Sequence, residues 1–241
     1  MRTLLGTMFV VVTSLTVLWG QQTPLRKESR DKLLLNLRSE NGEERSKAFE
    51  RLRSDRTALR SASVKTALVD LLDRENQRAA SGEGEDYAEY KGKLAETVVS
   101  IADWSDSRQV CILANSANPP KQLADHARIA VPCLLKKLKT APVLERGPVF
   151  ATLVQALAKG RNRLDSDTSR TLQQAILSGL HDSDASVRIS TVKALGRFGG
   201  EDMIPELKVV ADTDPDPSEG YAIRKWAGEA IAAIQKRAIR K

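Results

Sequence analysis

The sequence predicts an all-α protein in which antiparallel helical hairpins stack side by side into one solenoid. Three observations lead to this prediction. First, Leu (29) and Ala (28) dominate the 241 residues, whereas Gly (14), Pro (9) and aromatic residues (4%) are scarce, a composition that favours helices. Second, apolar residues recur at helical spacing along most of the chain. Third, one short pattern recurs at nearly constant intervals, as it does in repeat proteins.

The composition also excludes several classes of protein. With 41% hydrophobic residues and few Gly or Pro, the chain is neither collagen-like nor of low complexity. A β-sandwich or β-barrel would need more β-branched and aromatic residues and more frequent turns. The 38 Lys and Arg against 31 Asp and Glu give a formal charge of +7, which raises nucleic-acid binding as a first interpretation of the charge.

The N-terminal segment predicts export. After Met1 and Arg2, the stretch 3–25 contains no charged residue, and its most apolar part runs over 4–18. A basic start, a short apolar run and then polar residues are typical of a signal peptide. We therefore expect residues 1–20 to be a signal peptide, or an uncleaved N-terminal anchor, and residues 21–26 to be a short linker. Cleavage would leave 37 basic against 31 acidic residues, a charge of +6.

Residues 27–241 are expected to form the solenoid, with roughly five to six helical hairpins. The stretch 81–85 (SGEGE) is the clearest break between helices, and 119–139 is helical but its division is open. The apolar periodicity predicts helices near 27–39, 43–54, 57–79, 86–103, 106–117, 144–160, 167–180, 184–198, 202–212 and 218–238.

The repeat becomes visible when the C-terminal helices are compared with one another. The segment 187–195 (VRISTVKAL) has one counterpart 36 residues later, at 223–231, and another 38 residues earlier, at 149–157. Each begins with an apolar residue and carries Ala-Leu or Ala-Ile seven and eight positions further on, as in Ala230-Ile231. These positions share one helical face, and the small Ala allows a neighbouring helix to approach closely.

These residues resemble the HEAT-repeat family, particularly its short bacterial form. The match is specific over 143–238 and only permissive over 27–140, and it implies a HEAT-like or armadillo-like superhelix that binds other proteins. In the following repeat, Ser218 stands where the family pattern has Asp. The resemblance further implies pairing of Asp182 and Arg188 with neighbouring repeats. The residues that match the pattern are Asp182, Val187, Arg188, Ala194, Leu195, Gly196, Pro205 and Arg224.

Cys111 and Cys133 each lie in an apolar helical context. Their two interpretations are small buried hydrophobic residues, which we favour, and a disulfide in an exported chain. Spacing alone does not decide between them, because a disulfide depends on the geometry of the folded chain.

No catalytic, metal-binding or cofactor-binding constellation is predicted. His126 and His181 are the two histidines, and no His-Glu or Cys-x-x-Cys motif accompanies them. We interpret His181 as a helix cap. Asp212, Asp214 and Asp216 alternate as in a calcium loop, but Pro217 replaces the glycine that such a loop needs. We therefore expect an ordinary acidic turn, with Ser218 as the N-cap of the last helix.

The predicted function is non-catalytic: an exported scaffold, periplasmic or secreted, that binds a protein or peptide on one face of the solenoid. The alternative is electrostatic binding of an anionic polymer (nucleic acid, lipid headgroup or glycan). Export argues against chromosomal DNA, and contact with the inner membrane is expected only if the leader is not cleaved. Since acidic residues interleave with the basic ones, we interpret the charge as a soluble surface. The candidate binding residues are Arg146, Lys193, Arg197, Lys225 and Glu229.

Overall fold

A computed structural model describes residues 27–82, 88–160, 163–215 and 220–240, and these contain helices and turns but no strand. The predicted signal peptide, the Ser218 cap and Asp216 lie outside them. No helix among the described residues is both long and apolar enough to cross a membrane. The α-helices are α1 (Lys27–Asn36), α2 (Gly42–Arg53), α3 (Ala62–Ala80), α4 (Ala88–Ile101), α5 (Ser107–Ala114), α6 (Ala127–Leu138), α7 (Val143–Gly160), α8 (Ser166–Leu180), α9 (Ala185–Phe198), α10 (Ile204–Thr213) and α11 (Gly220–Ile239).

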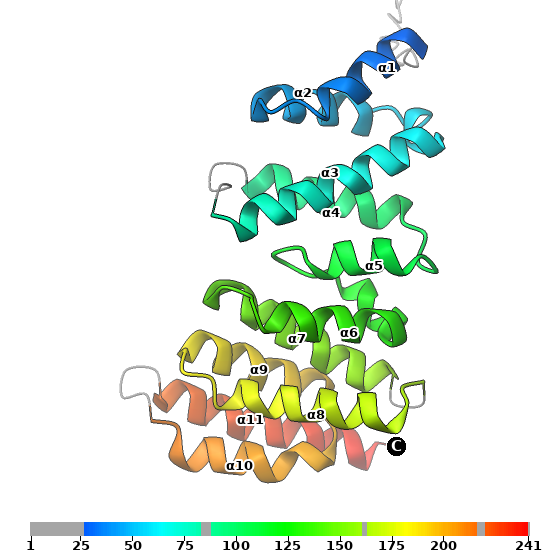
Figure 1. The fold of residues 1–241 in the computed structure, drawn as a ribbon. Helices are drawn as coiled ribbons and strands as arrows, with labels where there is room; N and C mark the ends of the chain where they lie inside the picture. The colour runs from blue at the N-terminus through cyan, green and yellow to red at the C-terminus, as the bar shows by residue number, and fades with distance from the viewer. Residues whose placement is uncertain (1–26, 83–87, 161–162, 216–219, 241) are drawn as a thin grey trace, which may run out of the picture.

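The helices stack into an elongated solenoid with α1 at one end and α11 at the other (Figure 1). They form six hairpins in the described chain: α1–α2, α3–α4, α5–η3, α6–α7, α8–α9 and α10–α11. The third hairpin is incomplete, because the 3-10 helix η3 (Lys121–His126) takes the place of its second helix. Further 3-10 turns, η1 (Ala58–Arg60) and η4 (Glu201–Met203), precede α3 and α10.

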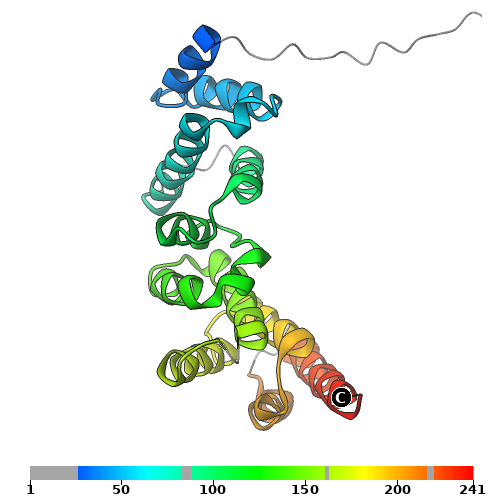
Figure 2. The ribbon, with the colours of Figure 1, turned by 90° about the vertical axis from the view of Figure 1, so that its right-hand side faces the viewer.

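Two parallel rows run along the solenoid. The first helices of the hairpins form one row, in which α5 contacts α6 and α8 contacts α10, and the second helices form the other, in which η3 packs on α7, α7 on α9 and α9 on α11. In Figure 2 the stack bends to one side at its C-terminal hairpins. The second helices lie on the concave side of this bend. We call the solvent side of α7, α9 and α11 the second-helix face.

The predicted helices are confirmed with three differences. The stretch 202–212 divides into η4 and α10. The stretch 57–79 divides into η1 and α3, because the Asp55 carboxylate accepts hydrogen bonds from the Thr57 and Ala58 amides and holds the chain in a separate turn. The undivided stretch 119–139 bends at His126, where η3 passes directly into α6. No side chain caps the start of α6, so the usual N-cap signal is missing there.

Asp and Asn side chains fix the start of several helices. Asp184 accepts hydrogen bonds from the amides of Ser186 (2.8 Å) and Val187 (3.3 Å), and Asn41 caps α2 in the same way. The pKa of Asp184 lies below its usual range, chiefly because the Ser186 hydroxyl donates to the carboxylate. Such caps satisfy amides that have no partner within the helix.

The buried apolar side chains form one continuous cluster from Leu37 to Ile234. Among the predicted repeat residues, Val187, Ala194, Leu195 and Ala230 are buried, and Ile231 packs against the cluster from its edge. A single hairpin cannot bury its apolar side alone, so each hairpin completes the core of its neighbours.

Three glycines mark points where neighbouring helices approach closely. A Cβ at Gly196 would lie 3.1 Å from the Ala230 Cβ, as expected for a small residue between α9 and α11. A Cβ at Gly147 would lie 2.8 Å from the Ser190 Oγ, between α7 and α9. At Gly179 the space is tighter still, since two ring atoms of Phe150 lie 2.7 Å away.

We expect Gly179→Ala to destabilise the protein by about 1–3 kcal/mol. The methyl group would clash with Phe150 and with the Thr191 hydroxyl at 2.8 Å, and both residues are buried and unable to withdraw. Gly92→Ala is the matched control: Gly92 is exposed in α4 with no atom near its Cβ position, so it should gain roughly 0.5–1 kcal/mol. Urea unfolding followed by circular dichroism measures both changes, and equal stabilisation by the two variants would contradict the packing at Gly179.

Candidate functional site

The second-helix face is assembled by close contacts between parallel helices. Gly147 of α7 faces Ser190 of α9, and Gly196 of α9 faces Ala230 of α11. These contacts place the outward-facing residues of the three helices on one continuous surface. On α9 the exposed positions include Lys193 and Arg197, which lie one turn apart.

Four of the five predicted binding residues lie together on this face. The Lys193 ammonium lies 3.8 Å from the centre of the Trp226 ring, which is a cation–π contact between α9 and α11. Lys225 lies 3.9 Å from Glu229 on α11, and both side chains are more than half exposed. Arg197 is exposed beside them. These positions remain predictions as binding residues, but the fold places them next to one another.

Arg146, the fifth predicted binding residue, lies apart from the other four. Its Nη1 atom lies 2.7 Å from the Asp182 carboxylate, and only 23% of the Arg146 side chain is exposed. The interaction joins the start of α7 to the turn after α8. The Arg146 guanidinium therefore joins one hairpin to the next through an ion pair and is not directed into solvent from the second-helix face.

A series of arginines links the hairpins in this manner. Arg188 binds Asp214 through two hydrogen bonds of 2.8 and 3.0 Å, and its Nη1 atom donates to the carbonyls of Asp182 and Ser183. The pair is almost fully buried, with 6% and 1% of the side chains exposed. The pairing of Asp182 and Arg188 with neighbouring repeats, which the resemblance implied, is present in the structure.

The acidic partner in the last repeat differs from the sequence-based assignment. Ser218 was expected at the Asp position, but Asp214 supplies the carboxylate that Arg188 binds. The turn after α10 is longer than in the preceding repeat, so alignment by a fixed interval misses this residue. Arg224 donates to the Asp214 backbone carbonyl at 2.7 Å. Asp214 thus has a structural role, and the described residues contain no cluster of metal ligands.

The N-terminal hairpin repeats the same arrangement, which sequence reasoning missed. Arg45 binds Glu75 at 2.9 Å and donates to the carbonyls of Ser39 and Glu40. Arg45 follows its N-cap by four residues, as Arg188 follows Asp184. That shared spacing is the signal in the sequence that extends the repeat to the N-terminal half.

Cys111 and Cys133 form a disulfide between α5 and α6, with their Cα atoms 5.3 Å apart. Our preferred interpretation of two buried hydrophobic residues was therefore wrong, and both cysteines are only half-buried. The disulfide lies beside the hairpin whose second helix is shortened to η3. Trp104, before α5, stacks on His126 at the end of η3, with 4.8 Å between the ring centres.

Lys137 gives this middle region a buried cation. Its ammonium donates to the backbone carbonyls of Asn115 and Ser116 and lies 3.0 Å from the Glu145 carboxylate. Burial lowers the pKa of Lys137, and the hydrogen bond and charge of Glu145 oppose that shift. The contacts join the end of α5 to α6 and α7, which indicates a structural role.

His181 follows α8, and its ring is more than half exposed. Its Nε2 atom lies 3.8 Å from a carboxylate oxygen of Glu206 on α10. The expected hydrogen bond from the ring to the last carbonyls of α8 does not appear among the contacts that the structure describes, where only the His181 backbone amide donates to a carbonyl, that of Ser178.

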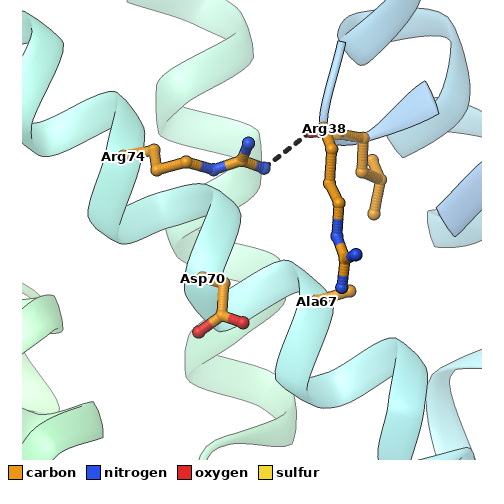
Figure 3. Close-up of a pocket in the computed structure, with 5 residues that line it drawn as sticks. Arg38, Ala67, Asp70 and Arg74 are labelled. Atoms are coloured by element: carbon orange, nitrogen blue, oxygen red, sulfur yellow. Dashed lines mark hydrogen bonds between the residues drawn. The ribbon is translucent and has the colours of Figure 1, made fainter. Parts of the chain in front are cut away.

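A cavity of about 340 Å³ lies on the first-helix side, between the turn after α1 and α3 (Figure 3). Arg74 points into the gap and donates to the Leu37 carbonyl at 2.7 Å. Asp70 is paired with Arg108 of α5 at 2.8 Å. Arg74 and Asp70 are thus engaged in holding neighbouring hairpins together, and the described residues that line the cavity include no nucleophile paired with a base.

The charges of the molecule are not distributed evenly. The helices α7, α9 and α11 carry nine basic residues but only two acidic ones, Glu145 and Glu229. The second helices α2 and α4, in contrast, carry six basic and five acidic residues. The nine basic residues are Arg146, Lys159, Arg188, Lys193, Arg197, Arg224, Lys225, Lys236 and Arg237. The C-terminal second helices are therefore richer in basic residues than the N-terminal ones.

The stacked helical hairpins define the protein as an α-solenoid. Residues 172–200, which include α9 and most of α8, match the family model of the HEAT repeat. Together with the all-helical fold, this match supports a HEAT-repeat family for the chain, with the matched repeat at residues 172–200. No curated protein matches the sequence of the chain. HEAT repeats generally mediate protein interactions as scaffolds and are generally non-catalytic.

Proposed function

We propose that the protein is an exported, non-catalytic scaffold, periplasmic or secreted, that binds a protein or peptide through the second-helix face. The observation that carries this proposal is the surface itself: three adjacent helices present exposed basic and uncharged side chains, and no other hairpin of the described chain covers them. Large solenoid faces of this kind bind partners through many side chains along their length.

Two independent features support export. The charge-free stretch 3–25 has the pattern of a signal peptide. The Cys111–Cys133 disulfide is of the kind that forms and persists in oxidising compartments. If the leader is not cleaved, the same solenoid is held at the inner membrane and still faces the oxidising side.

A reporter fusion tests the export part of this proposal. Residues 1–26 joined to an enzyme that folds only outside the cytoplasm should give an active reporter in a bacterial host. Arg2→Glu with an added Asp in the apolar run, as a matched control, should abolish that activity. A reporter that remains inactive with the native leader, and a full-length protein whose thiols are free when isolated, would contradict export.

Capture of partners tests the binding part. The tagged full-length protein is cross-linked in envelope fractions and purified under denaturing conditions. We expect the same partner to be enriched in replicate captures and lost when Lys193 and Arg197 are changed to Glu. Absence of any reproducible partner would count against a scaffold.

A further inference from the structure

We infer that the second-helix face binds an acidic, amphipathic segment of a partner protein, with carboxylates on α9 and apolar side chains on α7. This inference rests on the proposed function, because it names the chemistry of the partner for the same face. Three features of the face carry it: a pair of accessible cations, an uncharged strip beside them, and a field that is basic over all three helices.

The accessible cations are Lys193 and Arg197 on α9. They lie one helical turn apart and are both exposed. The Lys193 ammonium is positioned over Trp226, which orients the cation while leaving it accessible to an anionic ligand. Two carboxylates spaced by one turn of a partner helix would reach both cations, and Arg197 offers a planar fork that suits a carboxylate.

The uncharged strip runs along α7. Leu144 is 86% exposed, and Pro148, Ala151 and Gln155 are partly buried at helical spacing behind it. Gly147 packs against Ser190 on the adjoining side of α7, so this strip borders the cations of α9. Apolar side chains of a partner helix would bury Leu144 and the strip behind it.

The remaining basic residues of these helices favour a peptide over a polyanion. Many of them are engaged within the protein: Arg188 with Asp214, Lys159 with Asp125, and Arg237 with the carbonyls of Gly196 and Gly199. A nucleic acid or glycan would require a continuous track of accessible cations, whereas the α7 strip carries none. The ring of Trp226 lies under Lys193 and offers no free face there for stacking a base.

The field of the face would still assist binding from a distance. Arg146, Lys159 and Arg188 are paired with acids outside these helices, so the attraction comes from exposed cations such as Lys193, Arg197 and Lys236. Such steering accelerates association and depends on ionic strength. Glu229 is the exposed acid on this face. It lies beside Lys225 on α11, whereas the cation pair Lys193 and Arg197 lies on α9.

A defined peptide tests the inference with the purified full-length protein. The probe is a fluorescein-labelled 16-residue helix with Glu along one side and Leu along the other. We expect saturable binding that Lys193→Glu/Arg197→Glu weakens by about tenfold or more. The control Lys65→Glu/Lys208→Glu changes the net charge equally at exposed positions of first helices and should alter affinity less than about twofold. Circular dichroism verifies that both variants fold.

Three results would overturn the inference: no binding of the peptide, equal loss in the two double variants, or unchanged affinity when Gln replaces every Glu of the peptide. Heparin or a single-stranded DNA oligonucleotide that binds more tightly than the peptide, and is released by the same Lys193→Glu/Arg197→Glu variant, would assign the face to polyanions. If a partner captured from envelope fractions binds the Lys193→Glu/Arg197→Glu variant normally, recognition of an acidic segment is refuted. The proposed scaffold function would not be refuted by that result.

Discussion

Arg188→Ala is expected to lower the free energy of unfolding by about 3–5 kcal/mol, because it removes the cation that pairs with the buried Asp214 carboxylate. Arg188 is 6% and Asp214 1% exposed at their side chains. The substitution also removes hydrogen bonds to the carbonyls of Asp182 and Ser183. The hairpins α8–α9 and α10–α11 would lose the ion pair that joins them. Urea unfolding monitored by circular dichroism measures the change.

The control for Arg188 is an arginine with an exposed partner. Arg170 lies 3.8 Å from Asp167, and both side chains are more than two-thirds exposed, so Arg170→Ala should change stability by well under 1 kcal/mol. Arg188→Met combined with Asp214→Leu should cost less than Arg188→Ala alone, since no charge is then left unpaired. Similar losses for Arg188→Ala and Arg170→Ala would refute the role of the ion pair.

Loss of the Cys111–Cys133 disulfide is expected to cost about 3 kcal/mol, because the bond closes a loop of 22 residues in the unfolded chain. The effect should be strongest in the middle of the solenoid, where the disulfide joins α5 to α6 and η3 replaces a full second helix. Cys111→Ser/Cys133→Ser removes the bond, and the thermal midpoint measured by circular dichroism reports the loss.

Reductant provides the internal comparison for this prediction. Reduction should bring the wild-type midpoint close to that of the double serine variant and leave the variant itself unchanged. A wild-type midpoint that does not respond to reductant would show that the disulfide contributes nothing to the stability of this junction.

Helix positions were predictable because each hairpin must bury one apolar side, and that requirement produces a periodic sequence. The bend at His126 was not predictable from the sequence, because η3 and α6 follow each other without a side-chain cap or a polar break. The Arg45–Glu75 pair was missed because its acid lies within α3, thirty residues away, and not in a recognisable turn. The pairing of Asp214 with Arg188 was missed because more residues separate α10 from α11 than α8 from α9, which breaks the fixed interval.

The second-helix face illustrates a different limit of sequence reasoning. Acidic residues such as Glu201, Asp202 and Glu206 alternate with basic residues along the chain, yet they lie in turns and first helices. Basic residues such as Lys193 and Arg197 lie in second helices. Stacking places α7, α9 and α11 side by side, so their few acidic residues leave a mainly basic group of helices, although first helices such as α6 are basic as well.

Cross-linking mass spectrometry of the captured complex tests most directly whether the second-helix face binds the partner. An amine-reactive cross-linker reports which exposed lysines lie near it. We predict cross-links from Lys193, Lys225 and Lys236, and none from Lys65 or Lys208 on the first helices. Cross-links confined to Lys65 and Lys208, with Lys193 and Lys225 remaining fully reactive in the complex, would contradict binding at this face.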